Sequence, residues 1–144
     1  MKKQLLAVAM LFSGALAAAP AVALGADSSA QIAPTAQLEA RGAYVIATVQ
    51  ITCPVGDTVS QGYPAMLFIQ QATSKTTIAT GYGFLPVEAC TGSPQSVDVP
   101  VLATAPGSPF RIGPAEATLT GAACDSSFNC VPFNSGPVTI RIVH

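Results

Sequence analysis

The chain contains few of the side chains that enzymes use for catalysis. It has no tryptophan and a single histidine, His144, among 144 residues, and its seven aspartates and glutamates stand apart from one another. A catalytic triad needs a histidine near its nucleophile, and a hydrolytic metal site needs clustered ligands. The strings G-x-S-x-G, H-E-x-x-H and the P-loop are missing as well. We therefore expect no catalytic residues, no metal site and no cofactor, and a protein that is not an enzyme.

Positive charge is also scarce once the first 26 residues are set aside. The remaining cations are Arg41, Lys75, Arg111 and Arg141, and with seven carboxylates they give residues 27–144 a net charge of −3. Nucleic-acid binding depends on clustered lysines and arginines that neutralise phosphates. We therefore expect no nucleic-acid partner.

The first 26 residues have the order of a secretory signal peptide. Two lysines follow Met1, residues 5–16 are an apolar run, and residues 15–26 are rich in alanine. The run is too short for a stable membrane span, and no run of about 18 apolar residues follows it. Cleavage after Ala23 or Ala26 is expected to release a secreted, extracellular protein without a membrane anchor.

The four cysteines are expected to form two disulfides in that oxidising compartment. They are Cys53, Cys90, Cys124 and Cys130, and the sequence has no C-x-x-C motif to favour a redox pair or a zinc site. Four cysteines allow three pairings. A local Cys124–Cys130 bridge across a turn-rich loop, with Cys53 joined to Cys90, is preferred. A Cys53–Cys124 bridge between two sheets is the alternative.

Alternation of apolar and polar residues marks short strands through the rest of the chain. In the clearest strand, residues 43–53, every odd position is apolar, which predicts that the odd face is buried. Ile46 interrupts the opposite face, and one exposed isoleucine needs no explanation. Pro100 places a later strand at a sheet edge, because proline has no N–H for a neighbouring strand. Seven strands are predicted, at residues 35–40, 43–53, 65–71, 76–82, 96–102, 115–120 and 138–143.

Seven short strands with glycine and proline between them predict an all-β fold. The simplest architecture is an Ig-like antiparallel β-sandwich stapled by the two disulfides. It is Ig-like only, because the tryptophan of true immunoglobulin domains is missing. Residues 1–26 are assigned to the signal peptide, 27–34 to a flexible N-terminal segment and 35–144 to the sandwich domain.

Phenylalanines near the predicted loops are the remaining candidates for recognition. Phe110, Phe128 and Phe133, with Arg111 beside the first, would form a ligand-binding site if they gathered at one end of the sandwich. The alternative is that the rings cover the ends of the core as lids. The lid hypothesis is favoured, because only Arg111 and Asn134 flank the rings with polar groups that could orient a ligand.

Four short segments and the late C-x5-C carry a resemblance to known proteins. The segments are GAYV at 42–45, VQITCP at 49–54, CTG at 90–92 and FRIGPA at 110–115. Together they resemble small secreted actinobacterial proteins of unknown function, which implies an Ig-like domain with two disulfides. Such domains are similar in architecture to the neocarzinostatin family, secreted sandwiches that carry an apolar chromophore in a cleft. The Cys124–Cys130 bridge matches that family's late short bridge, whereas the separation of Cys53 and Cys90 departs from it.

These observations lead to three functional hypotheses. The first is a secreted, non-catalytic Ig-like binding or structural module whose partner is another protein, a cell-wall polymer or a second copy. The second is a carrier of a small apolar ligand, as the neocarzinostatin resemblance implies. The third is a secreted protease inhibitor, because the TCP segment at 52–54 is also similar to secreted subtilisin inhibitors.

Overall fold

A computed structural model describes residues 27–104 and 107–144 of the chain. The predicted signal peptide lies outside these residues. The described residues are mostly in β-strands, with one short 3-10 helix and no helix long and apolar enough to cross a membrane. The elements are β1 (Ser29–Glu39), η1 (Ala40–Gly42), β2 (Tyr44–Thr52), β3 (Thr58–Val59), β4 (Met66–Ala72), β5 (Ile78–Phe84), β6 (Glu88–Ala89), β7 (Gln95–Ala103), β8 (Gly113–Cys124) and β9 (Cys130–Val143).

Each of the seven long strands overlaps a predicted strand, although β9 begins at Cys130 where residues 138–143 were predicted, and the seven form one closed sheet. Their order is β4-β5-β7-β2-β1-β9-β8, and β8 pairs with β4 to complete the ring. Neighbours are antiparallel except β1 and β9, which are parallel. The fold is therefore all-β and barrel-like, whereas the expected sandwich would have two clearly separate sheets. Alternation along a strand identifies its buried face but does not reveal whether two sheets are joined at their edges.

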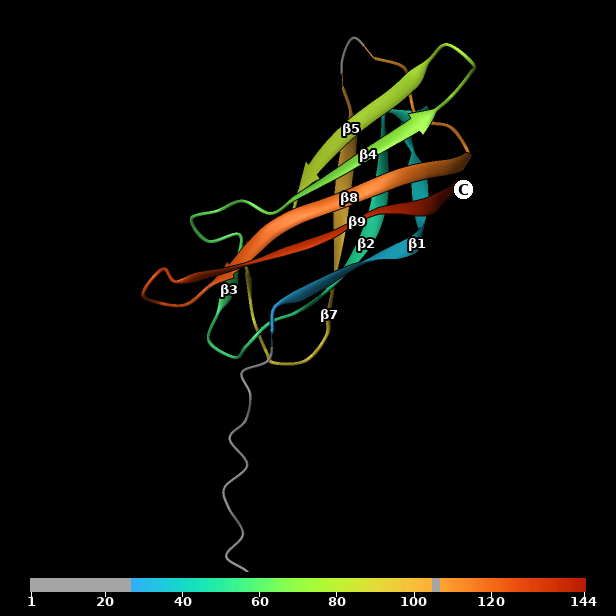
Figure 1. Cartoon of the computed structure of the whole chain (residues 1–144). Coiled ribbons are helices and arrows are strands. Elements are labelled where there is room, and N and C mark those ends of the chain that lie inside the picture. The colour runs from blue at the N-terminus through green and yellow to red at the C-terminus, as the bar shows by residue number, and fades with distance from the viewer. Residues whose placement is uncertain (1–26, 105–106) are drawn as a thin grey trace, which may run out of the picture.

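Two of the joints in this closed sheet are short. β1 meets β9 only along residues 35–37, and β5 meets β7 only through Gly81 and Tyr82. A Cβ atom on Gly81 or Gly83 would lie 2.3 Å from a carbonyl oxygen of β7, so glycine is what lets these strands come so close. The prediction that Pro100 marks an edge strand is wrong, because β7 lies between β5 and β2; Pro100 itself lies beyond the short pairing with β5. In Figure 1, β4, β5, β8 and β9 cross in front of β2 and β7.

The predicted buried faces are confirmed. The odd positions of β2 point into the core, as do the odd positions of β7 and of the first half of β8, and the even positions at the end of β9. The buried side chains on these faces are Val45, Ala47, Val49 and Ile51 of β2, Val97, Val99 and Val101 of β7, Ala115, Ala117 and Leu119 of β8, and Ile140 and Ile142 of β9. Their removal from water is the main force that holds the closed sheet together.

The first strand begins earlier than predicted. Residues 27–34 were expected to be flexible, but β1 starts at Ser29 and pairs there with Thr52 of β2. The sequence hides this strand because its small and polar residues do not alternate, and its pairing is irregular between Ile32 and Ala36. Pro34 lies in that irregular stretch and cannot donate a ladder hydrogen bond. The long partner strand β2, not local alternation, determines that β1 is extended.

Both disulfides join the cysteines that were preferred from the sequence. Cys53 follows β2 and is bonded to Cys90, with 5.4 Å between their Cα atoms. Cys124 and Cys130 end β8 and begin β9, so their bridge closes the base of a tight hairpin. The alternative Cys53–Cys124 pairing is therefore wrong, and no free cysteine is left. Two disulfides in a small domain are typical of proteins from oxidising compartments.

Candidate functional site

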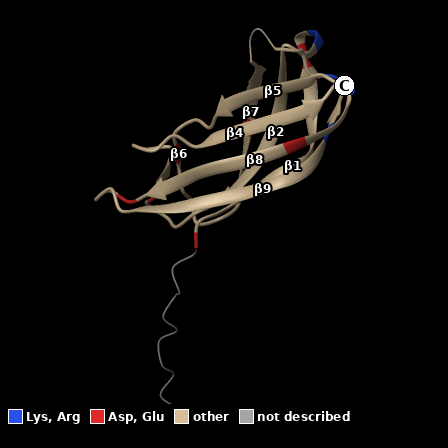
Figure 2. Cartoon of the chain, turned by 45° about the horizontal axis from the view of Figure 1, so that its top comes forward, with Lys and Arg blue, Asp and Glu red and all other residues tan. Residues whose placement is uncertain are grey.

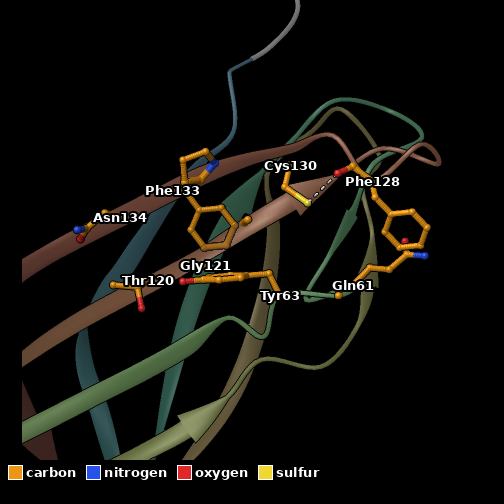
Figure 3. Close-up of a pocket in the computed structure, with 11 residues that line it drawn as sticks. Gln61, Tyr63, Thr120, Gly121, Phe128, Cys130, Phe133 and Asn134 are labelled. Atoms are coloured by element: carbon orange, nitrogen blue, oxygen red, sulfur yellow. Dashed lines mark hydrogen bonds between the residues drawn. The ribbon is translucent and has the colours of Figure 1, made fainter.

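A cavity of about 660 Å³ lies between residues 61–63 and the β8–β9 hairpin, and we call it the hairpin pocket. Most of its wall is apolar, with aromatic rings contributed by both sides. The residues that line it are Gln61, Gly62, Tyr63, Thr120, Gly121, Ala122, Phe128, Cys130, Pro132, Phe133 and Asn134. Figure 3 shows Tyr63 and Phe133 near its centre and Phe128 beside Gln61 at its far end.

Phe133 and Gly121 form the inner end of the pocket. They are directly paired across β9 and β8. A Cβ atom on Gly121 would lie 2.7 Å from Cζ of Phe133 and 2.5 Å from Cβ of Ala65, so this position has room only for glycine. The Phe133 ring is 6% exposed and packs over the glycine into the core. Phe133 is therefore both a lid on the core and part of the pocket wall.

Phe128 forms the outer end of the pocket, at the tip of the hairpin. Its side chain is 65% exposed, and a Cβ atom on Gly62 would lie 3.8 Å from its ring. Its backbone has a φ of 60°, which is rare for a bulky side chain and costs about 1–3 kcal/mol. Such strain persists only where the surrounding structure determines the conformation. The hairpin therefore holds an exposed aromatic ring in place.

Asp125 holds this tip. The backbone N–H groups of Ser127 and Asn129 donate to its Oδ1 at 2.8 and 2.9 Å, and the side-chain amide of Asn129 donates to its Oδ2 at 2.9 Å. The backbone N–H of Phe128 donates to the Asp125 carbonyl oxygen at 3.0 Å. The hydrogen bond from the Asn129 side chain, followed by those from the backbone, lowers the pKa of the Asp125 carboxyl below 3.8. The hairpin is thus held by the Cys124–Cys130 disulfide at its base and by the hydrogen bonds to Asp125 at its tip.

We expect the tip to loosen in acid. The pKa of Asp125 is lowered in the folded protein. The hydrogen bonds that its carboxylate accepts are therefore complete above the ordinary pKa of 3.8, and they are lost as the pH falls through the lower pKa of the folded state. The amide resonances of Ser127 and Asn129 should therefore shift together in an NMR titration, with a midpoint below 3.8. Asp125→Ala should give the acid-like shifts at neutral pH, whereas Ser126→Ala, in the same exposed turn, should not. Unchanged amide shifts in Asp125→Ala would contradict this role.

Neutral polar groups line the rest of the pocket. Gln61, Tyr63, Thr120 and Asn134 supply two amides and two hydroxyls, and none of the four makes a side-chain hydrogen bond within the described part of the chain. No lysine, arginine, aspartate or glutamate lines the cavity. These groups can donate to and accept from a ligand, but they carry no charge.

The structure brings together only half of the predicted ligand-binding set. Phe128 and Phe133 meet in the hairpin pocket, but Phe110 and Arg111 lie before the start of β8, at its other end. Phe110 is 1% exposed and covers the core there, as the lid hypothesis predicts. Phe128 is not a lid, because the turn at Asp125 turns its ring out of the core.

Arg111 is held through its backbone. Its N–H donates to Oε1 of the buried Gln71 at 2.8 Å, and its carbonyl oxygen accepts from Nε2 at 2.7 Å. The same Nε2 donates to the carbonyl oxygen of Pro114 at 3.3 Å. Gln71 thus fastens the chain between Phe110 and β8 to β4, and the exposed guanidinium of Arg111 lies far along the strand from the pocket.

Gln61 and Gly121 are not predicted from the sequence, and Tyr63 is outside the predicted ligand-binding set. Tyr63 stands between Gly62 and Pro64, at the start of a predicted strand, where an aromatic ring carried by a loop can join such a site. Gly121 has no such signal, because its role depends on the partner that faces it across the hairpin. Residues 27–104 and 107–144 contain no group of three or more His, Cys, Asp or Glu placed to hold a metal ion. Comparison with protein-family models, curated proteins and solved structures found no match to this chain.

Proposed function

We propose that this protein is a secreted, non-catalytic binding protein that carries a small, uncharged, apolar ligand in the hairpin pocket. The observation that supports this most is the meeting of Tyr63, Phe128 and Phe133 on one cavity. A volume of about 660 Å³ lies within the range of about 300–1,000 Å³ that small-molecule sites occupy. Such sites combine apolar walls with a few polar groups that orient the ligand.

The chemistry of the wall favours a neutral, flat, partly aromatic molecule. Aromatic rings pair through offset stacking or edge-to-face contacts, and each pair adds about 0.5–1.5 kcal/mol to the burial of its area. The free amides and hydroxyls of Gln61, Tyr63, Thr120 and Asn134 suit a ligand with hydroxyl or carbonyl groups at its rim. A charged ligand would lose its hydration without gaining an opposite charge.

The hairpin favours binding because it is ordered before a ligand arrives. Asp125 and the Cys124–Cys130 disulfide hold the tip, so Phe128 loses little conformational freedom when a ligand packs against it. Preorganisation of this kind raises affinity by lowering the entropic cost of association. It also explains why an exposed phenylalanine is held with a positive φ.

An Ig-like sandwich remains our proposal for the architecture. β1, β2 and β7 would form one layer and β5, β4, β8 and β9 the other, with the two short joints as the corners where the layers touch. Secretion is supported by the leader-like start of the sequence and by the two disulfides. Such a frame places the pocket at one end, on the loops and hairpin that a sandwich has free for binding.

Titration of the purified, oxidised protein with N-phenyl-1-naphthylamine, a neutral aromatic fluorophore, tests the proposal. We expect saturable binding with an affinity that Phe128→Ala lowers about tenfold, because one stacked ring is lost. Since Phe128 is exposed, the melting temperature should hardly change. Phe84→Ala is the matched control, because Phe84 is also exposed but lies outside the pocket.

Two outcomes would refute the carrier proposal. The first is the lack of saturable binding by the folded protein. The second is an equal loss of affinity in Phe84→Ala and Phe128→Ala, which would mean that the probe adheres to apolar surface in general. A loss in Phe128→Ala alone, with an unchanged melting temperature, supports a site at the hairpin.

A further inference from the structure

A second apolar surface lies on the outer face of β4, β5 and β7, and at one edge its Met66 is paired with Thr120 of the hairpin pocket. Leu102, Tyr82 and Phe68 stand next to one another in register across the three strands. Two residues along, Phe84 is paired with Met66, and Pro100 lies beside Phe84 across the β5–β7 gap. Their neighbours in sequence point into the core, so all six face outward. We call these six residues the apolar band.

The exposed apolar side chains of the band form one contiguous patch, unlike isolated apolar residues on a surface. Met66, Tyr82, Phe84 and Leu102 are 37–61% exposed, and the rings of Tyr82 and Phe84 pack edge to face with centroids 5.8 Å apart. Together the four side chains leave about 400 Å² open to solvent, within the range of the largest patch on a typical monomer, which often marks an interaction site. The band is continuous because register places its members side by side.

The band also contains a hollow. β5 and β7 stop pairing after Tyr82 and Leu102, and a cavity of about 570 Å³ opens there between Phe84 and Pro100. The backbone of Gly83 and the side chains of Tyr82 and Leu102 also line it. A protruding ring and a hollow that could accept it thus lie next to each other on one face.

The lack of charge on the band allows a second copy of the protein to bind there. β4 and β5 contain no charged residue, and Figure 2 shows both strands without blue or red. Residues 27–144 carry a net charge of −3, so most of the surface repels a second copy weakly, but the band does not. An interface between identical chains about a two-fold axis needs a self-complementary patch, which a ring beside a hollow provides.

We infer that two copies of this protein associate through the apolar band, with Phe84 of each inserted into the hollow of the other. The open area of the band is smaller than the roughly 800 Å² per partner that a standard interface buries. The dimer is therefore weak and forms only at high protein concentration. The hollow that receives Phe84 shares no lining residue with the hairpin pocket.

Sedimentation equilibrium of the oxidised protein between about 5 µM and about 1 mM tests the inference. The weight-average mass should rise across this range from that of one copy towards that of two. Phe84→Glu and Leu102→Glu should each weaken the dimer at least tenfold, because each places a charge in the interface. Ile78→Glu is the control, because Ile78 is as exposed as Leu102 and lies on β5 outside the band.

Variants are compared after near-UV circular dichroism and melting show the wild-type fold, and the two variants on different strands guard against one failing to fold. A wild-type chain that stays monomeric at about 1 mM overturns the inference and leaves the band for another partner. A dimer that survives both Phe84→Glu and Leu102→Glu overturns it too, as does an equal loss in Ile78→Glu. Probe binding at the hairpin is a separate readout, so failure of either proposal leaves the other standing.

Discussion

Val49→Asp will prevent the protein from folding at room temperature, whereas Gln50→Asp will fold. Val49 is fully buried in β2, where its pairing partners on either side are Ile32 and Val97. A carboxylate there would have no cation nearby, since the cations of the described residues, Arg41, Lys75, Arg111 and Arg141, are all exposed. Burying the charge, or protonating it and leaving it without a hydrogen bond, costs several kcal/mol, comparable with the whole stability of about 5–15 kcal/mol.

Near-UV circular dichroism and urea unfolding measure this difference. Gln50 is the appropriate control because it is exposed and faces Ser96 across the strand pair. Thr48 also faces outward, but its hydroxyl donates to Oδ1 of Asp98 at 2.7 Å, so Thr48→Asp would set two carboxylates side by side. Equal tolerance of Val49→Asp and Gln50→Asp would show that the buried face of β2 is assigned wrongly.

Phe110→Ala will destabilise the protein by about 3–5 kcal/mol, because it empties the space of a fully buried ring. The surroundings are shaped for this residue and cannot collapse easily. Gly42, with a φ of 90°, accepts the Phe110 N–H at its carbonyl oxygen, and a Cβ atom on Gly42 would lie 2.1 Å from the carbonyl oxygen of Phe110. A Cβ atom on Gly81 would lie 2.9 Å from Cζ of the ring.

Urea unfolding monitored by far-UV circular dichroism gives the free energy directly. Phe84→Ala should change it by less than about 1 kcal/mol, because that ring is on the surface. Phe128→Ala should behave like Phe84→Ala, since the two side chains are similarly exposed. A small effect of Phe110→Ala would mean that its ring is not part of the core.

The buried faces could be predicted because each depends on the sequence of one strand. Val45, Val49 and Ile51 alternate with less apolar residues, and that period is enough to orient β2. The disulfide pairing could also be predicted from the sequence. Cys124 and Cys130 are close in sequence, and once they are paired only Cys53 and Cys90 are left to bond. Ile46 shows where such local reasoning ends. The sequence predicts an isolated exposed residue, whereas Ile46 is half-buried, is paired with Pro100 and borders the apolar band.

The closure of the sheet and the hairpin pocket could not be predicted in the same way. Closure depends on which strands meet, and the joint between β1 and β9 involves residues at opposite ends of the described chain. The pocket depends on Tyr63 meeting a hairpin about 60 residues later, a contact that no local pattern encodes. The sequence favours Phe128 as a lid on the core, because its hydrophobicity is visible in the sequence but its positive φ is not.

The parallel pairing of β1 with β9 has a consequence for how the protein is made. Until β9 has been synthesised, β8 lacks its neighbour and β1 has a free edge, so the ring cannot close however well the earlier strands pair. Free strand edges recruit other chains and promote aggregation. The edges of β1 and β8 are therefore covered in a single step, when β9 pairs with both strands, and only then is the nascent chain protected from aggregation through them.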